Sequence, residues 1–171
     1  MVAHPPLAAL SGRGAALARA ALVATAVALF VRTFVLAPAL VPSASMAPAL
    51  LAGDRVLVNR MLYAGPLPAA LAPLLPAREP RRGDVVWLRS PEDGVTNLVK
   101  RCAAVGGDSF GGRSLSPGEL AVLGDRRQDS RDSRHFGPVA RAAVTGRVSW
   151  VLWSRPRGGA VRWRRILRAV R

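Results

Sequence analysis

The longest apolar stretch of the chain runs from Ala15 to Val31, with Arg19 as its one charged residue. As a helix, this run measures about 25 Å at ~1.5 Å per residue, close to the hydrocarbon thickness of a bilayer. Arg19 can extend to one face of the membrane and Arg32 to the other. We therefore expect a transmembrane anchor over residues 15–37, preceded by a short basic N-terminus over residues 1–14.

The same run has two other interpretations. A cleaved secretory signal also combines a basic start, an apolar middle and small residues, here Ala37-Pro38-Ala39. An uncleaved anchor that ends at Pro38 is favoured, because the apolar character continues to Val41. A core helix of a soluble protein is disfavoured, because the run has no polar face. The positive-inside tendency predicts a cytoplasmic N-terminus and an extracytoplasmic remainder.

Beyond residue 38 the pattern changes to short apolar–polar alternations that are separated by glycine-containing turns, and these predict strands. The strand over 97–105 places Lys100 and Cys102 on one face of the sheet. We expect a mostly-β catalytic domain over residues 38–155. The other strand signals lie at 55–59, 85–88, 120–123 and 139–153, the last with Gly146 as a break.

Three segments do not fit this pattern. Residues 61–80 are rich in Pro, Ala and Leu and either dip into a bilayer surface or cover the core. Residues 126–134, RRQDSRDSR, are too charged for a core, and their simplest interpretation is a solvated loop. Residues 156–171 form a basic tail that either lies on anionic lipid as an amphipathic stretch or is disordered.

The net charge of +15 on 171 residues indicates anionic partners, either lipid or nucleic acid. We disfavour nucleic acid, because the chain has no recognition helix, zinc spacing or aromatic-interleaved basic strand. Cys102 is the one cysteine, which excludes an internal disulfide and a multi-cysteine metal site. A small buried hydrophobe is its expected role, ahead of a nucleophile. We expect no cofactor and no metal.

A proline-flanked polar run directly follows the apolar stretch: residues 41–60 read VPSASMAPALLAGDRVLVNR. Pro42 and Pro48 disfavour a helix or an interior strand, so residues 43–46 are predicted as an irregular loop. A serine held in such a loop, Ser45, is a candidate nucleophile. A turn serine that bonds its own backbone is the simpler interpretation of an isolated Ser-x-Ser.

Lys100 is the only lysine: of 25 Lys and Arg residues, the other 24 are arginine. Arginine cannot be deprotonated in a protein, whereas a desolvated lysine can, so Lys100 is a candidate general base. An ordinary lysine, with a pKa of ~10.4, is only about 0.1% neutral near pH 7.4. Burial would have to lower the pKa by about three units, which is equivalent to about 4 kcal/mol.

Four segments occur in an order that is specific in combination. They are residues 42–50, 53–59, 82–86 with 99–101, and 124–137. Together they resemble bacterial type I signal peptidases, the membrane-bound Ser/Lys endopeptidases of the S26 family that remove secretory signal sequences. The resemblance covers about residues 30–153.

The resemblance implies that Ser45 is the nucleophile, that Lys100 is its general base, and that Ser43 and the Ser45 backbone N–H form an oxyanion hole. It implies support from Ser130, which would orient Lys100, from Met46, which would line the site, and from two ion pairs, Asp132 with Arg134 and Asp125 with Arg101. It also implies a coiled antiparallel β domain after one membrane helix in the bacterial cell membrane. The expected partners are signal peptides of exported preproteins and anionic lipids.

Several positions depart from the family pattern: Ala44 replaces Gly, Ala49 replaces Thr, Arg126 replaces Asn, and Gln128-Asp129 replaces Asp-Asn. Residues 108–116 are shorter than usual, so any accessory subdomain is minimal or absent. A dedicated maturation peptidase with few substrates is the nearest alternative function. His135 as a triad base, a self-cleaving repressor and an inactive membrane adaptor are disfavoured.

Overall fold

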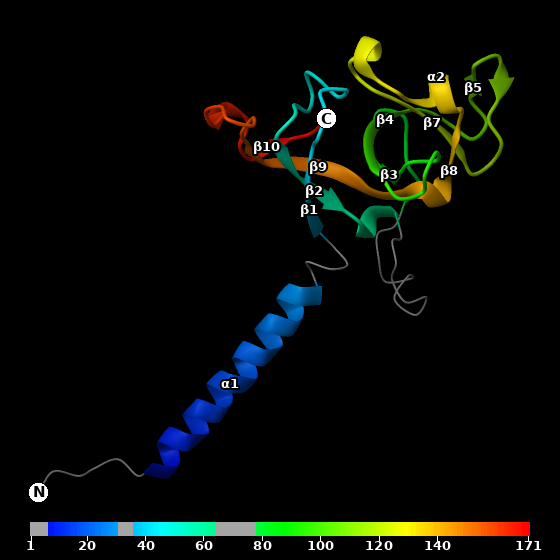
Figure 1. The fold of residues 1–171 in the computed structure, drawn as a ribbon. Coiled ribbons are helices and arrows are strands. Elements are labelled where there is room, and N and C mark those ends of the chain that lie inside the picture. The colour runs from blue at the N-terminus through cyan, green and yellow to red at the C-terminus, as the bar shows by residue number, and fades with distance from the viewer. Residues whose placement is uncertain (1–6, 31–35, 64–77) are drawn as a thin grey trace, which may run out of the picture.

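The computed structural model describes residues 7–30, 36–63 and 78–171 (Figure 1). Residues 1–6 of the predicted N-terminus, 31–35 of the predicted anchor and 64–77 of the predicted connection lie outside the described residues. The described residues begin with α1 (Leu7–Phe30), which extends away from the sheet in Figure 1. Among the described residues, no helix is long and apolar enough to cross a membrane.

The start of the β domain differs from the expectation of an anchor over 15–37. Residues Leu36–Leu40 form β1, which pairs antiparallel with β2 (Asp54–Asn59). Pro38 therefore does not end the helix, because it lies inside β1 opposite Leu57. Proline is tolerated there because β1 is an edge strand, where a missing backbone N–H leaves no neighbour unpaired.

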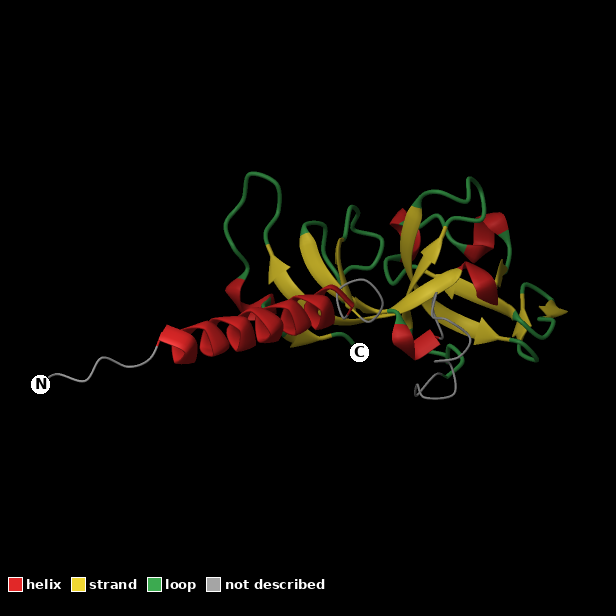
Figure 2. Ribbon diagram, turned by 90° about the horizontal axis from the view of Figure 1, so that it is seen from below, coloured by secondary structure: helices red, strands yellow, loops and turns green. Residues whose placement is uncertain are grey.

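One curled antiparallel sheet organises the rest of the chain, as the yellow strands in Figure 2 show. Its strand order is β1-β2-β9-β3-β4-β7-β8, and β10 pairs with β9 beside this path. The expectation of a mostly-β antiparallel domain is confirmed. The remaining strands are β3 (Val85–Arg89), β4 (Asn97–Val105), β7 (Glu119–Leu123), β8 (Val139–Ala140), β9 (Val144–Ser154) and β10 (Arg168–Ala169).

The strands predicted at 55–59, 85–88, 97–105 and 120–123 are confirmed to within one residue by β2, β3, β4 and β7. Consecutive residues of β3 enter opposite cores: Val85 packs with Val56 and Val148, and Val86 packs in a second cluster with Leu120. Both faces of β3 are thus buried, because each face packs against a different one of the two core clusters.

Gly146 was predicted as a break, and this prediction is wrong. It lies inside β9, opposite Trp87 of β3. A Cβ at this position would lie 2.6 Å from Val58 Cγ1 and 2.9 Å from the Asn59 carbonyl oxygen. The glycine therefore lets β2 and β9 approach each other, and the strand continues through it.

Two regions complete the fold. The short segment at 108–116 contains β5 (Ser109–Phe110) and β6 (Arg113–Ser114), which form a two-stranded sheet. The C-terminal residues are not a disordered tail: they form η6 (Trp163–Arg165) and β10, and Val170 is buried. The sequence pattern missed this packing because the partners of the tail are distant in the sequence.

Candidate active site

The loop that carries Ser45 connects β1 to β2 and is closed by backbone hydrogen bonds. Val41 N–H donates to the Asp54 carbonyl (2.9 Å), and Gly53 N–H donates back to the Val41 carbonyl (3.0 Å). Met46, predicted to line the site, is 1% exposed and packs in the core beneath the loop. The loop is irregular as predicted, and its apolar residues hold Ser45 in one place.

Lys100 and Ser45 meet in a buried contact. Lys100 projects from β4, and its Nζ donates to Ser45 Oγ at 3.1 Å. The two residues are 4% and 7% exposed, respectively. The Ser43 hydroxyl donates to the same Ser45 oxygen at 3.3 Å. This geometry permits a direct proton transfer from Ser45 to a neutral Lys100.

Ser130 lies on the other side of Lys100, with its Oγ 3.1 Å from Nζ. It belongs to the 126–134 segment that was predicted as a solvated loop, and that prediction is wrong for Ser130, Asp132 and Ser133, which are all buried. They are buried because the charge of Asp132 is paired and their hydroxyl groups are hydrogen-bonded.

Gly124 makes the approach of these segments possible. A Cβ at this position would lie 2.2 Å from Ser130 Oγ and 2.7 Å from the Ser45 carbonyl oxygen. Just beyond it, Arg126 N–H donates to that Ser45 carbonyl at 2.9 Å. The end of β7 therefore touches both Ser130 and the loop that carries Ser45.

Asp132 connects the end of β7 to the segment that carries Ser130. Its carboxylate is fully buried and accepts hydrogen bonds from Gly124 N–H (2.9 Å) and from the Arg134 guanidinium (2.8 and 3.0 Å). It also caps α2 (Ser133–Phe136) through Arg134 N–H. Burial would raise the pKa of Asp132, but the hydrogen bonds from Arg134 and Gly124 prevail and the pKa is lowered. The group thus stays ionised and keeps Ser130 next to Lys100.

Burial is the main cause that lowers the pKa of Lys100 from its usual value. The negative charge of Asp132 opposes this shift, and the positive charge of Arg134 adds to it. The direction of the shift favours the neutral amine that a general base requires.

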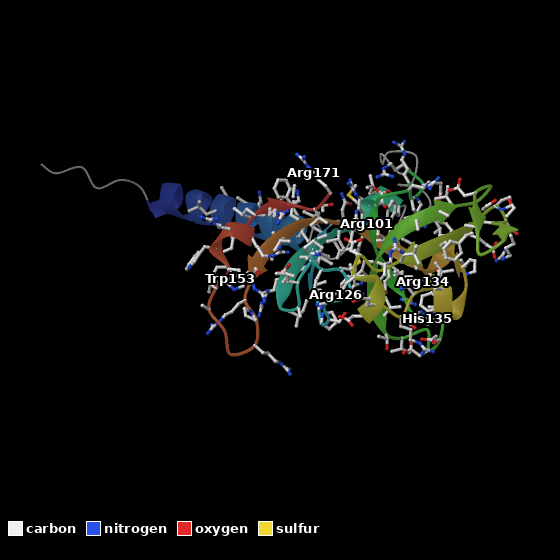
Figure 3. The ribbon with its side chains drawn as sticks, turned by 90° about the horizontal axis from the view of Figure 1, so that it is seen from above. Arg101, Arg126, Arg134, His135, Trp153 and Arg171 are labelled. Atoms are coloured by element: carbon white, nitrogen blue, oxygen red, sulfur yellow. The ribbon has the colours of Figure 1, made fainter. Side chains whose placement is uncertain are left out.

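The second predicted ion pair lies on the opposite side of β4. Arg101 Nε and Nη2 each donate to one oxygen of Asp125 at 2.7 Å. Its Nη1 also donates to the carbonyls of Gly83 (2.8 Å) and Arg171 (3.0 Å), and Figure 3 shows Arg101 and Arg171 close together. Arg101 thereby joins β4, the end of β7 and the C-terminus.

The other candidate groups have different partners. His135, labelled beside Arg134 in Figure 3, accepts a hydrogen bond from Asp132 N–H through Nδ1 at 3.3 Å and is about half exposed. Cys102 is buried, and burial raises the pKa of its thiol to about 11, as expected for an inert core cysteine. Within the described residues, no group of three His, Cys, Asp or Glu residues could hold a metal ion.

A groove of about 1100 Å³ opens beside the Ser45 loop. It is lined by residues of β1, β2, β3, β9 and η5 (Arg141–Ala143), includes Asn97 at the start of β4, and reaches Pro42, next to Ser43. Among the described strands, β1 pairs only with β2, and residues 97–100 of β4 pair only with β3. The unpaired edge of β1 thus runs along the groove, and the part of β4 that pairs only with β3 reaches it at Asn97.

Sequence reasoning missed two contributors to this site. Gly124 was predicted to end a strand and belongs to the resembling segment 124–137, but it was given no role in the site. Arg165 had no signal at all, because it is one of several arginines in the tail. In the structure it donates to Asp54 at 2.6 Å and to the Ala49 carbonyl at 2.8 Å.

Comparison with known proteins gives consistent matches. Residues 15–111 and 109–153 match the family described as "Signal peptidase, peptidase S26". The chain is 38% identical over 91 residues to the mitochondrial ATP-independent inner membrane protease subunit 1b of Arabidopsis thaliana, covering 44% of this chain and 52% of the relative. It is 37% identical over 83 residues to signal peptidase I of Pseudomonas aeruginosa, covering 48% and 29%, respectively.

The chain therefore spans about half or less of the length of these curated relatives. Among solved structures, a signal peptidase I from Enterococcus faecalis V583 aligns with a TM-score of 0.37 and 23% identity. That alignment covers 42% of this chain and 98% of the solved chain.

Proposed function

Because the chain belongs to the signal peptidase S26 family, we propose that it is a serine endopeptidase that removes N-terminal signal peptides from exported preproteins. The observation that carries the proposal is the buried 3.1 Å contact between Lys100 Nζ and Ser45 Oγ. A dedicated maturation peptidase with few substrates is the second candidate. It is favoured by the small β5–β6 segment and by the relatives named as inner membrane proteases.

In the proposed mechanism, neutral Lys100 takes the proton of Ser45 as Oγ attacks the scissile carbonyl. The Ser43 hydroxyl and the Ser45 backbone N–H stabilise the oxyanion. Protonated Lys100 then gives its proton to the leaving amine, and an acyl-enzyme remains on Ser45. Lys100 next activates the water that hydrolyses this ester. Ser130 acts as a positioning residue, since its hydroxyl is 3.1 Å from Nζ.

The substrate is proposed to bind as an extended chain in the groove. The free edges of β1 and of residues 97–100 offer backbone groups to a peptide on either side, which favours strand addition. Small side chains near the cleaved bond would let the peptide backbone approach Ser45. The groove ends beside the Ser45 loop at Pro42, which is consistent with cleavage at one end of the bound segment.

We further propose that the protein acts at the bacterial cell membrane, with its N-terminus in the cytoplasm and its catalytic domain outside. Large apolar side chains of α1 are exposed, including Leu17, Leu22 and Val27. A second exposed set, Trp150, Trp153, Trp163 and Leu167, lies on β9 and the C-terminal segment among arginines. Tryptophan and arginine together favour the headgroup region of anionic lipid.

Brominated lipids in anionic vesicles should quench the tryptophan fluorescence of the full chain, because three of its four tryptophans belong to the exposed set. A variant with Trp150, Trp153 and Trp163 changed to Phe keeps only Trp87, which lines the groove, and should be quenched much less. Equal quenching of the two proteins, or none in either, would contradict lipid contact through this surface.

Purified full-length protein should cleave a synthetic signal peptide with an Ala-x-Ala sequence before the cut, and mass spectrometry would locate the cleaved bond. The Ser45→Ala variant should leave the peptide intact. Cleavage of one native precursor, but not of the generic peptide, would select the dedicated maturation peptidase. Failure of the folded wild-type protein to cleave either substrate would refute the proposed activity.

A further inference from the structure

The C-terminal residues 162–171, hereafter the strap, fold back across the sheet. Arg162 N–H donates to the Ser154 carbonyl at 2.9 Å, β10 pairs with β9, and Val170 N–H donates to the Ser149 carbonyl at 2.9 Å. In Figure 1 the C-terminus lies beside the cyan loop that contains Ser45. The strap is thus a fixed part of the fold next to the proposed active site.

One end of the strap holds the nucleophile loop through Arg165. The guanidinium Nη2 donates to Asp54 Oδ2 at 2.6 Å and to the Ala49 carbonyl at 2.8 Å, and Nη1 donates to the Pro48 carbonyl at 3.4 Å. The side chain of Arg165 is 12% exposed, and that of Asp54 is fully buried. Asp54 also accepts a hydrogen bond from Leu51 N–H at 2.9 Å. The planar guanidinium thus contacts the Asp54 carboxylate through Nη2 and two loop carbonyls through Nη2 and Nη1, which fixes direction as well as distance.

The other end of the strap reaches the strand that carries Lys100. Val170 packs in the same core cluster as Met46 and Val99, which are the sequence neighbours of Ser45 and Lys100. The Arg171 carbonyl accepts a hydrogen bond from Arg101, the residue after Lys100, at 3.0 Å. The strap therefore contacts both elements that supply the Ser45–Lys100 pair.

Besides the packing of Val170, polar contacts connect the strap to the loop. A cavity of about 330 Å³ lies between Ala49 and residues 168–171, so apolar contact is incomplete at this place. The hydrogen bonds of Arg165 cross from one segment to the other near this cavity. Their loss would leave the loop free to shift while the sheet stays folded.

We propose that the strap is a positioning element that holds the Ser45 loop against β4, with Arg165 as its principal positioning residue. This inference rests on the proposed Ser/Lys peptidase function. The arginines of the C-terminal segment thus divide into two sets. Arg165 points inward to Asp54 at 2.6 Å, and Arg162 points to it at 3.8 Å and donates to the Ala52 carbonyl at 3.2 Å. Arg164 and Arg168 are exposed and remain available to lipid.

Arg164 offers a matched control, because it is the same residue type in the same short helix, η6, and its side chain is exposed. We expect Arg165→Gln to lower kcat by about 100-fold, as a displacement of about 1 Å can do, while KM changes little because the groove is elsewhere. Arg164→Gln should match wild type. Arg165→Lys, which keeps the charge but not the planar guanidinium, should fall between the two.

A second readout does not depend on catalysis. Lys100 is the only lysine, so lysine labelled with ¹³C gives one side-chain signal in the NMR spectrum of the full chain. We expect Arg165→Gln to shift this signal and to bring the Lys100 pKa closer to that of an ordinary lysine, because the loop no longer shields it. The signal of Arg164→Gln should coincide with that of wild type.

Melting temperatures and circular dichroism are measured alongside, and Arg165→Lys replaces Arg165→Gln if the latter does not fold. A folded Arg165 variant whose Lys100 signal and kcat equal those of Arg164→Gln would overturn the proposal. If the wild-type protein cleaves no peptide, the proposed function fails, but the Lys100 signal still decides whether the strap positions the pair.

Discussion

A folded Lys100→Arg variant should lose peptide cleavage by at least about 10⁴-fold, because a general base and the activation of a nucleophile are lost together. Arginine retains the positive charge and the apolar stem, so a structural interaction with Ser45 and Ser130 would survive in part. Its pKa stays above ~12, so it cannot accept the Ser45 proton near neutral pH. Cleavage is measured by following product formation from the signal peptide.

Ser45→Ala is the control, since it removes the hydroxyl with almost no change in volume. Both variants should retain the circular dichroism spectrum of the wild type and should be inactive. Substantial cleavage by folded Lys100→Arg would refute the assignment of the base. Attention would then turn to His135, whose Nδ1 accepts a hydrogen bond from Asp132 N–H in this structure.

The pH dependence of the wild type tests the same assignment. Lys100 is an effective base only when it is neutral, so kcat/KM should rise with pH as the ammonium loses its proton. Burial lowers the pKa of Lys100, so the midpoint of this rise should lie below that of an ordinary lysine. A midpoint at or above ~10.4, the ordinary lysine value, would contradict the buried-base assignment.

Gly124→Ala should produce the second large loss, about 100-fold in kcat/KM, because the added methyl group displaces groups that must stay within hydrogen-bond distance of each other. Its Cβ would lie 2.2 Å from Ser130 Oγ, 2.5 Å from Ser130 Cβ and 2.7 Å from the backbone oxygen of Ser45. The hydroxyl of Ser130 can rotate, but the Ser45 backbone can move only together with its loop. We therefore expect a wider separation between Ser45, Lys100 and Ser130.

Gly14→Ala is the matched substitution, because a Cβ at this helical position meets no atom within 4 Å. It should leave activity unchanged. Near wild-type cleavage by folded Gly124→Ala would contradict this prediction. It would show that activity does not depend on the present distances between Gly124, Ser130 and Ser45. A crystal structure of the variant would measure the displacement directly.

Much of the sheet was predictable from the sequence, because a half-buried strand shows its alternation locally. The strand over residues 97–105 is confirmed with the same bounds as β4, and β2, β3 and β7 differ from their predicted bounds by one residue. The sequence also nominated Ser45 and Lys100, from a loop between prolines and from a solitary lysine among arginines. Their catalytic roles stay predictions.

Predictions from local patterns were wrong where the environment of a residue depends on partners that are distant in the sequence. Gly146 is a strand residue because Val58 and Asn59 pack against it, and Pro38 is a strand residue because β1 is an edge. Asp132 lies in a highly charged segment but is fully buried, because Gly124 N–H and Arg134 satisfy its carboxylate. Without those partners, burial of this charge would be prohibitive.

The sequence by itself therefore determined the mostly-β character of the domain and the identity of the candidate nucleophile and base, since both depend on residue type and short-range spacing. Only the tertiary structure decided that the C-terminal arginines divide into an inward and an outward set. Arg165 and Asp54 are 111 residues apart, and no periodicity connects them. Their pairing depends on the path of β9 and β10 across the sheet, which brings Arg165 next to Asp54. The pairing matters because a buried carboxylate without a cation would be strongly destabilising.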